Sequence, residues 1–249
     1  MIASTLPGER PGSPPLTCGE RIPIIGLGAG GHACVVIDIL RQDGRFEVVA
    51  LLDRDPRRWG EALEGVTILG GDDRLAALRE HGVAHAFVGV GGIGSQEGRR
   101  LLVERAALAG YIVVQAVHPR AVVAATARLG EGTTVGANAI INPRAVVSAH
   151  VIVNTGAIVE HDAVVEPFAH LAPAAVVLGA AHVGAGAFVG AGAVVREGTS
   201  VGAGALVGAG AIVLTDIPPD TVAYGCPAKA IRPVGAGIPP SQPRPRAGR

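Results

Sequence analysis

The sequence predicts two architectures in one chain, a small parallel α/β sheet with helices on its faces and then a left-handed parallel β-helix. Three observations predict them. Short apolar runs alternate with helix-like stretches from residue 22 to residue 116. From Val117 onward, an aliphatic residue recurs at every sixth position through Val213. Finally, 37 of the 249 residues are glycine and only seven are aromatic, so the core must consist of small aliphatic side chains.

Both ends of the chain, residues 1–21 and 234–249, are expected to be disordered tails. They are rich in Pro, Gly and Arg and contain almost nothing to bury. The N-terminal segment lacks the apolar core of a signal peptide, and Gly or charge interrupts every later apolar stretch well before 18 residues. We therefore expect neither a signal peptide nor a membrane span.

Charge and cysteine content restrict the partners and the compartment. The 21 basic residues balance the 21 acidic ones, so the broad electropositive surface of a nucleic-acid-binding protein is not expected. Cys18, Cys34 and Cys226 show no paired spacing, which favours a reducing compartment over a disulfide framework. A cytoplasmic location is expected.

The first domain, residues 22–116, is predicted from alternating strands and helices. Strands are expected at 22–26, 46–52, 85–90 and 111–114, and helices at 32–42, 72–81 and 95–109. Alternation of this kind indicates a parallel sheet with crossover helices.

The second domain, residues 117–233, is predicted from the six-residue period. Seventeen consecutive aliphatic positions fit it, and Ala, Thr or Val stands four places after each of the first sixteen. A period of six matches neither a helix nor a lone strand, but it is typical of the hexapeptide repeat of a β-helix. With three repeats to a coil, the domain should hold about 5.7 coils and stand about 27 Å tall at one strand spacing per coil.

A glycine-rich loop precedes the first predicted helix. Gly26, Gly28 and Gly31 fit G-x-G-x-x-G between a strand and a helix, and Asp53 ends the next strand. Amides at a helix N-terminus can face phosphate and an acid can face a ribose or base; the alternative is that these glycines serve only a tight turn. An NAD-dependent oxidoreductase would need a further domain beside the nicotinamide, and the segment before Val117 is too short to supply one.

Two motifs resemble a known family. Residues 224–232, YGCPAKAIR, are similar to the G-x-P-A-K-x-I-R ending of hexapeptide-repeat acyltransferases. Within the repeat, the segments Asn154-Thr155, Glu160-His161-Asp162 and Phe168-Ala169-His170 resemble the sialic acid O-acetyltransferase and UDP-4-amino-sugar N-acetyltransferase (NeuD/PglD-like) family. The resemblance extends over about residues 22 to 233.

This resemblance implies a fold, a reaction and ligands. It implies a Rossmann-like N-terminal domain that binds a nucleotide sugar, and a homotrimer that binds acetyl-CoA between adjacent β-helices, with no metal. The acetyl acceptor would be an amino or hydroxyl group of a sugar, with a UDP-4-amino sugar favoured over sialic acid. The implied substrate-binding residues are Gly28, Gly30, Gly31, His32, Asp53 and Arg54.

The chemistry requires a base that accepts a proton near neutral pH, which imidazole does best. We predict His161 as that base, with Asp162 holding its tautomer and stabilising the imidazolium. The resemblance implies that Asn154 and His170 position the coenzyme thioester or the acceptor. It further implies that backbone amides, including those of Gly190 and Gly192, line the pantetheine arm.

Three alternatives remain at this point. One is O-acetylation of sialic acid by the same machinery. A second is a γ-carbonic-anhydrase-type metalloenzyme, for which His161 and His170 would supply two of three zinc ligands. A third is an inactive scaffold, which would lack the base. The terminal motif and the N-terminal domain favour the acetyltransferase.

Overall fold

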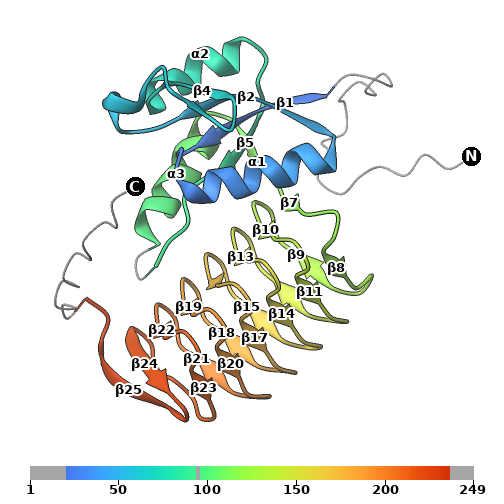
Figure 1. Ribbon diagram of the computed structural model, residues 1–249, viewed down its shortest axis with the longest axis vertical. Coiled ribbons are helices and arrows are strands. Elements are labelled where there is room, and N and C mark those ends of the chain that lie inside the picture. The colour runs from blue at the N-terminus through green and yellow to red at the C-terminus, as the bar shows by residue number, and fades with distance from the viewer. Residues whose placement is uncertain (1–20, 94–95, 236–249) are drawn as a thin grey trace, which may run out of the picture.

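The computed structural model describes residues 21–93 and 96–235, so nearly all of both predicted tails lies outside the described residues. An α/β part lies along one side of a triangular β-helix, with its first helix against the early coils (Figure 1). Both predicted architectures are confirmed.

The α/β part is a six-stranded sheet in the order β3-β4-β2-β1-β5-β6. Its parallel strands are β1 (Ile22–Leu27), β2 (Phe46–Leu52), β4 (Val66–Gly70), β5 (His85–Val88) and β6 (Ile112–Val113), and β3 (Ala62–Leu63) runs antiparallel to β4. The helices are α1 (Gly31–Asp43), α2 (Leu75–Glu80) and α3 (Glu97–Leu108). Two apolar clusters cover the sheet, one on each face, because successive side chains of a strand point to opposite sides.

Two features of this part differ from the sequence-based prediction. The hairpin of β3 and β4 was not predicted, although residues 66–70 alternate between buried and exposed as an amphipathic strand should. The helix expected at residues 72–81 starts as a 3₁₀ turn (Asp72–Arg74), and its α-helical portion is only six residues long.

The β-helix consists of three parallel sheets, and every predicted aliphatic position is the second residue of a two-residue strand. The first sheet contains β7 (Ala116–Val117), β10 (Thr134–Val135), β13 (Ile152–Val153), β16 (His170–Leu171), β19 (Phe188–Val189) and β22 (Leu206–Val207). The second contains β8 (Val122–Val123), β11 (Ile140–Ile141), β14 (Ile158–Val159), β17 (Val176–Val177), β20 (Val194–Val195) and β23 (Ile212–Val213). The third contains β9 (Arg128–Leu129), β12 (Val146–Val147), β15 (Val164–Val165), β18 (His182–Val183) and β21 (Ser200–Val201).

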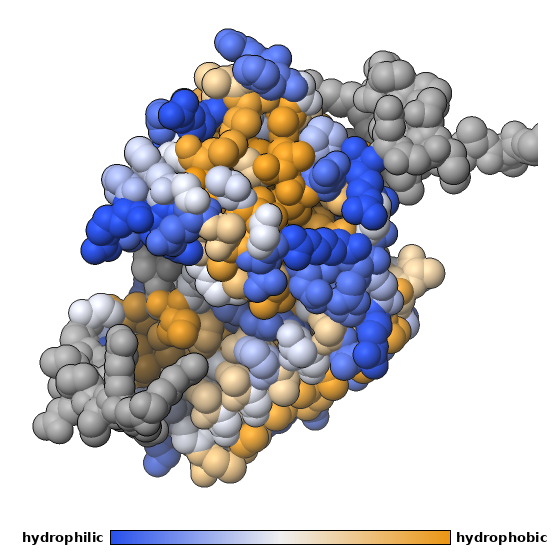
Figure 2. Space-filling model, turned by 45° about the horizontal axis from the view of Figure 1, so that its top comes forward, coloured by the Kyte–Doolittle hydropathy of each residue, from blue (hydrophilic) through white to orange (hydrophobic). Residues whose placement is uncertain are grey.

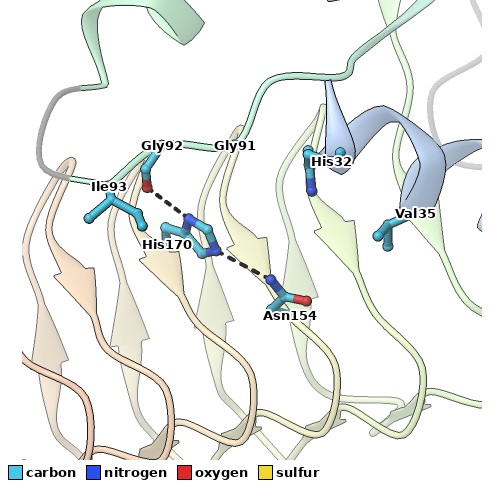
Figure 3. A pocket seen from close by; sticks show the side chains of 8 residues that line it. His32, Val35, Gly91, Gly92, Ile93, Asn154 and His170 are labelled. Atoms are coloured by element: carbon cyan, nitrogen blue, oxygen red, sulfur yellow. Dashed lines mark hydrogen bonds between the residues drawn. The ribbon is translucent and has the colours of Figure 1, made fainter. Parts of the chain in front are cut away.

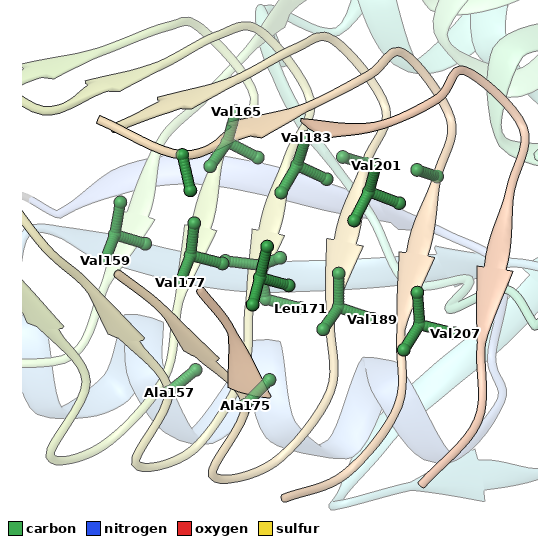
Figure 4. Packing of buried hydrophobic residues seen from close by; sticks show 14 of the residues in the cluster. Ala157, Val159, Val165, Leu171, Ala175, Val177, Val183, Val189, Val201 and Val207 are labelled. Carbon is green, nitrogen blue, oxygen red and sulfur yellow. The ribbon is translucent and has the colours of Figure 1, made fainter. Parts of the chain in front are cut away.

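Each strand pairs with the strand one coil, or 18 residues, further along, as Ile158 pairs with Val176. We call the turn from the first to the second sheet the first corner, that from the second to the third sheet the second corner, and that back to the first sheet the third corner. Inside, from coil to coil, valine stacks mainly on valine and alanine on alanine (Figure 4), and Val159, Val177 and Ala175 are fully buried. Small aliphatic residues thus fill the narrow interior, as predicted.

The outward residues of the second sheet are all aliphatic, in contrast to those of the third. We call this row the aliphatic ladder; it contains Val122, Ile140, Ile158, Val176, Val194 and Ile212. Val122 is 61% exposed. Figure 2 shows apolar surface running along the lower edge of the β-helix. A continuous apolar sheet face of this kind indicates a contact surface.

A hairpin of β24 (Thr221–Gly225) and β25 (Ala228–Pro233) closes the far end of the prism and contains the terminal motif. Strand β24 extends the first sheet by pairing with β22. Within residues 21–93 and 96–235, no helix combines the length and apolar character needed to cross a membrane.

Candidate active site

The predicted site residues lie at three places: in or beside a cavity between the domains, at the second corner of the β-helix, and, for Gly190 and Gly192, further along the first corner. The cavity measures about 440 Å³ and is lined by Gly31, His32, Val35, Gly91, Gly92, Ile93, Asn154 and His170 (Figure 3). It therefore brings the predicted nucleotide loop of the α/β part next to two predicted residues of the β-helix.

His170 is the outward residue of β16 and forms one wall of this cavity. Its Nδ1 donates to the carbonyl of Gly92 at 3.0 Å, and its Nε2 lies 3.4 Å from the amide nitrogen of Asn154. Burial is the main cause that lowers the pKa of His170 to about 4; the bond to Gly92 opposes this change and the charge of Arg99 adds to it. The ring is therefore neutral near pH 7 and acts by hydrogen bonding.

His32 faces the same cavity from the first turn of α1 (Figure 3). Its Nε2 is buried and has no hydrogen-bond partner among the described residues. Burial lowers the pKa of His32 to about 3, with smaller contributions from Arg99 and His170. A buried polar atom without a partner is costly, so this nitrogen is suited to a hydrogen bond with a ligand.

The nucleotide loop is held by an acidic residue at the end of β2. The carboxylate of Asp53 accepts from the backbone nitrogens of Ala29 and Asp55, each at 2.9 Å. Arg58 donates to the carbonyl of Ala29 at 2.6 Å and lies 3.4 Å from Asp53. Asp53 thus anchors the loop, whereas the sequence predicted that its carboxylate faces a ribose or base. The contact of Arg58 with the loop was not predicted.

Among the other predicted loop residues, Gly30, Gly31 and Arg54 are exposed, whereas the amide of Gly28 already donates to Leu52. Gly28 has a φ of 91°, which favours glycine, and Gly30 is the N-cap of α1 without a side-chain cap. A Cβ on Gly31 would meet no atom within 4 Å. Arg54 is exposed and makes no hydrogen bond or ion pair within the described part of the chain. The exposed backbone at the start of α1 is therefore suited to phosphate, and Arg54 is an exposed cation in the turn after β2.

At the second corner, His161 and Asp162 form the predicted pair. Nδ1 of His161 donates to Oδ2 of Asp162 at 2.8 Å, so the carboxylate reaches the ring. Both side chains face solvent, at 58% and 40% exposure. Nε2 of His161 has no hydrogen-bond partner among the described residues. The ring lies over Gly179 in the next coil, where a Cβ would stand only 2.8 Å from Cε1.

A third residue joins this pair, and sequence analysis did not predict it. Arg144 donates through Nε and Nη2 to the two carboxylate oxygens of Asp162, at 2.6 and 2.7 Å. This contact, followed by the bond from His161, holds the pKa of Asp162 well below its ordinary value. The carboxylate is therefore ionised throughout the working pH range.

Within one chain, the cavity and the second corner are on different sides of the prism. His170 belongs to the first sheet and Asn154 to the first corner, whereas His161 occupies the corner opposite the first sheet. The three residues that the motif grouped together are consequently not brought together in a single chain.

Gly190 and Gly192 lie at the first corner, two coils beyond Asn154. Their amides donate to Val207 at 2.8 Å and Pro173 at 3.0 Å. A Cβ on Gly190 would meet the backbone of the next coil, and Gly192 has a φ of 64°. The backbone therefore favours glycine at both positions, and both amides already form hydrogen bonds with neighbouring coils.

The orientation of the two domains depends on a buried cation that sequence analysis missed. Arg99 of α3 is 4% exposed and donates to the carbonyls of His150 and Phe168 at the third corner, and to Gln96 at 2.9 Å. Arg100 stacks on the Phe168 ring at 4.3 Å. Burial lowers the pKa of Arg99 to about 10, so it stays charged. These contacts hold the α/β part against the β-helix and so define the cavity.

The described residues contain no group of three or more His, Cys, Asp and Glu side chains arranged to hold a metal. His161 and His170, the two zinc ligands considered above, are separated by the width of the prism.

Known proteins resemble this chain in both sequence and fold. Residues 23–106 match the family model of the PglD N-terminal domain. A perosamine N-acetyltransferase from Caulobacter crescentus, solved with CoA and GDP-perosamine, is 40% identical with a TM-score of 0.79, over 84% of this chain and 96% of that one. The chain belongs to the NeuD/PglD-like family of hexapeptide-repeat sugar acetyltransferases.

A second NeuD/PglD-like structure agrees. The acetyltransferase domain of PglB from Neisseria gonorrhoeae, solved with acetyl coenzyme A, is 32% identical with a TM-score of 0.78, over 85% of this chain and all of that one. WeeI from Acinetobacter baumannii, at 23% identity and a TM-score of 0.72, shares the fold. No curated protein sequence matched the chain. The predicted family and enzyme class, an acyltransferase, are confirmed.

Proposed function

We propose that this protein transfers the acetyl group of acetyl-CoA to the amino group of a nucleotide-linked amino sugar, with His161 as general base. The observation that carries the proposal is the exposed pair of His161 and Asp162, because it leaves Nε2 of the imidazole available to a substrate. The 40% identical relative, named a perosamine N-acetyltransferase, supports an amine acceptor.

The pair of His161 and Asp162 is suited to take a proton from the amine and to return one to the leaving thiolate. Asp162 accepts the Nδ1 hydrogen of His161, which leaves the lone pair of Nε2 pointing away from the protein. Nε2 takes the proton of the amine as its nitrogen attacks the thioester carbonyl, and a C–N bond forms. The C–S bond then breaks, and the imidazolium returns the proton to the departing thiolate as CoA.

We propose that a homotrimer completes this site, as the aliphatic ladder supports. The ladder is flanked by the first corner, with Asn154, and the second corner, with His161. If three copies turn this face toward a threefold axis, the second corner of each copy meets the first corner of its neighbour. His161 of one chain then approaches the cavity of the next, which contains His170.

The ligands can be assigned to separate parts of this composite site. The nucleotide would lie at the start of α1, near Gly30, Gly31 and Arg54, and the sugar would enter the cavity between His32 and His170. Acetyl-CoA would occupy the groove between two prisms. There Gly190 and Gly192 would provide a wall without side chains. Their amides already donate to neighbouring coils and would not bind the coenzyme.

Product analysis tests the reaction. The protein is mixed with acetyl-CoA and, separately, GDP-perosamine, UDP-4-amino sugars, CMP-sialic acid or free sialic acid, and products are identified by mass spectrometry. We expect acetylation of a nucleotide-linked amino sugar by the wild type, and little product with His161→Ala. Acetylation of sialic acid alone would replace the proposed reaction with O-acetylation.

Mixed trimers test the shared site. His161→Ala and His170→Gln chains, each expected to have low activity, are co-expressed with different tags and purified together. If each site takes His161 from one chain and His170 from its neighbour, every mixed trimer that carries both tags has one intact site, so about one third of the sites are restored. A site contained within one chain would show no restoration.

A further inference from the structure

Arg144 lies one coil before Asp162, at the equivalent position of the second corner. Its guanidinium contacts both carboxylate oxygens of Asp162, and one of these, Oδ2, also accepts the Nδ1 hydrogen of His161 at 2.8 Å. A continuous chain of charge-assisted hydrogen bonds therefore runs along this corner from a guanidinium to the proposed base.

Few other groups face the ring of His161 in this chain. Glu160 accepts from the backbone nitrogen of His161 at 3.3 Å, and Gly179 contributes only backbone beneath the ring. Asp162 is the one carboxylate bonded to the ring among the described residues, and Arg144 is the one cation bonded to that carboxylate.

We propose that Arg144 is a positioning residue that holds the Asp162 carboxylate in the orientation that receives His161 and offsets part of its negative charge. The inference rests on the proposed role of His161. A single bond would let an exposed carboxylate rotate, whereas a two-point contact with a planar guanidinium fixes its plane. The positive charge of Arg144 also balances part of the negative charge that the ring faces.

The fold permits a clean removal of this side chain. Arg144 has a φ of 62°, and the equivalent positions of the following coils, Asp162, Ala180 and Gly198, have φ values of 61°, 54° and 65°. Glycine adopts this left-handed conformation without strain, so Arg144→Gly should fold at least as well as the wild type. Ala180→Gly is the matched control, because it makes the same backbone change one coil beyond Asp162 and leaves the ion pair intact.

The first experiment needs no substrate. Histidine ring signals of the protein alone are followed by NMR as the pH is changed, and His161→Ala identifies the signal of His161. Nη2 of Arg144 and Nδ1 of His161 bind the same oxygen. Two positive charges about 6 Å apart in water repel each other enough to shift a titration by about half a pH unit. Arg144→Gly should therefore raise the His161 midpoint by about that amount, and Ala180→Gly should leave it in place.

The second experiment measures turnover with acetyl-CoA and GDP-perosamine. We expect Arg144→Gly to lower kcat about tenfold, a fraction of what the base itself contributes, with KM for acetyl-CoA unchanged. Arg144→Lys should recover part of the loss, since it restores the charge without the two-point contact. In a His161→Ala background, adding Arg144→Gly should lower kcat no further.

The outcomes separate this inference from the proposed function. If His161→Ala keeps the wild-type kcat, the proposed base is wrong and the positioning role is overturned with it. If His161→Ala is impaired but Arg144→Gly keeps the wild-type midpoint and kcat, the inference alone is overturned.

Discussion

Gly179→Ala is the sharpest test of where the structure places the proposed base. Gly179 lies one coil beyond His161, and its φ is outside the left-handed region, so the backbone accepts alanine without strain. The new Cβ, however, would stand 2.8 Å from Cε1 and 2.9 Å from Nε2 of the imidazole. Carbon atoms normally pack at about 3.5 to 4.0 Å, so the ring must move by about 1 Å.

The exposed ring is the part that can yield, because the coil backbone is held by bonds to both neighbouring coils. Its movement takes Nδ1 out of the 2.8 Å bond to Asp162 and displaces Nε2. A displacement of about 1 Å at a reacting group can cost about 10² in rate, so we expect kcat to fall about 10- to 100-fold. Replacing this glycine should leave the free energy of unfolding unchanged or raise it by up to about 1 kcal/mol.

The assay compares kcat with acetyl-CoA and GDP-perosamine, alongside the melting temperature, for Gly179→Ala and a control. Gly98→Ala is suitable, since a Cβ there meets no atom within 4 Å. In a His161→Ala background the clash disappears, so adding Gly179→Ala should have no further effect. A wild-type kcat for Gly179→Ala, under conditions where chemistry limits the rate, would refute this placement of the base.

The remaining predictions concern the base, the nucleotide loop, the assembly and stability. His161→Ala should lower kcat by about 10² to 10⁴ with little change in melting temperature, and higher pH should rescue it in part if the acceptor is an amine but not if it is a hydroxyl. Asp53→Ala should weaken nucleotide-sugar binding in calorimetry but not acetyl-CoA binding, because its carboxylate holds Ala29 in the loop; equal loss of both would contradict the division of ligands. Light scattering should give about three times the 25.0 kDa chain mass, and a clean monomer at micromolar concentration would exclude the shared site. His170 has a folded pKa of about 4 against 6.5 in the unfolded chain, so the unfolded state binds more protons between these values. Its contribution to the free energy of unfolding, up to about 3 kcal/mol, should be present above pH 6.5 and lost as the pH falls toward 4. Denaturant titrations at pH 7 and pH 5 should show a smaller loss in His170→Gln than in the wild type.

Much of the β-helix could be predicted because its register is set by local sequence. Each coil repeats the same backbone, so Val159 and Val177 occupy equivalent positions and one aliphatic residue in six defines every strand. The hairpin of β3 and β4 was missed because two short strands with a tight turn carry little periodic signal. The cavity was also beyond sequence reasoning, since it depends on how Arg99 docks the α/β part onto the third corner.

The coil length of 18 residues also predicts which side chains of the site lie together and which lie apart, and neither prediction was made from the motifs. Arg144 and Asp162 are 18 residues apart, one full coil, which places their side chains side by side at one corner. His161 and His170 are nine residues apart, half a coil, which places them on opposite sides of the prism. Spacing in a repeat protein thus indicates both contact and separation, and the separation of His161 from His170 supports the proposal that two copies share a site.

The electrostatic surroundings of the histidines also distinguish the base from the residues that bind ligands. A general base must take up a proton and release it in every turnover, so its charged form has to be accessible near neutral pH. His170, with its pKa lowered to about 4 by burial beside a buried arginine, holds that proton too weakly, and so does His32. His161 is half-exposed and bonded to a carboxylate that stays ionised, so an imidazolium there is solvated and paired. This contrast supports the proposal that His161 at the second corner is the base and that the neutral rings of His32 and His170 orient the sugar.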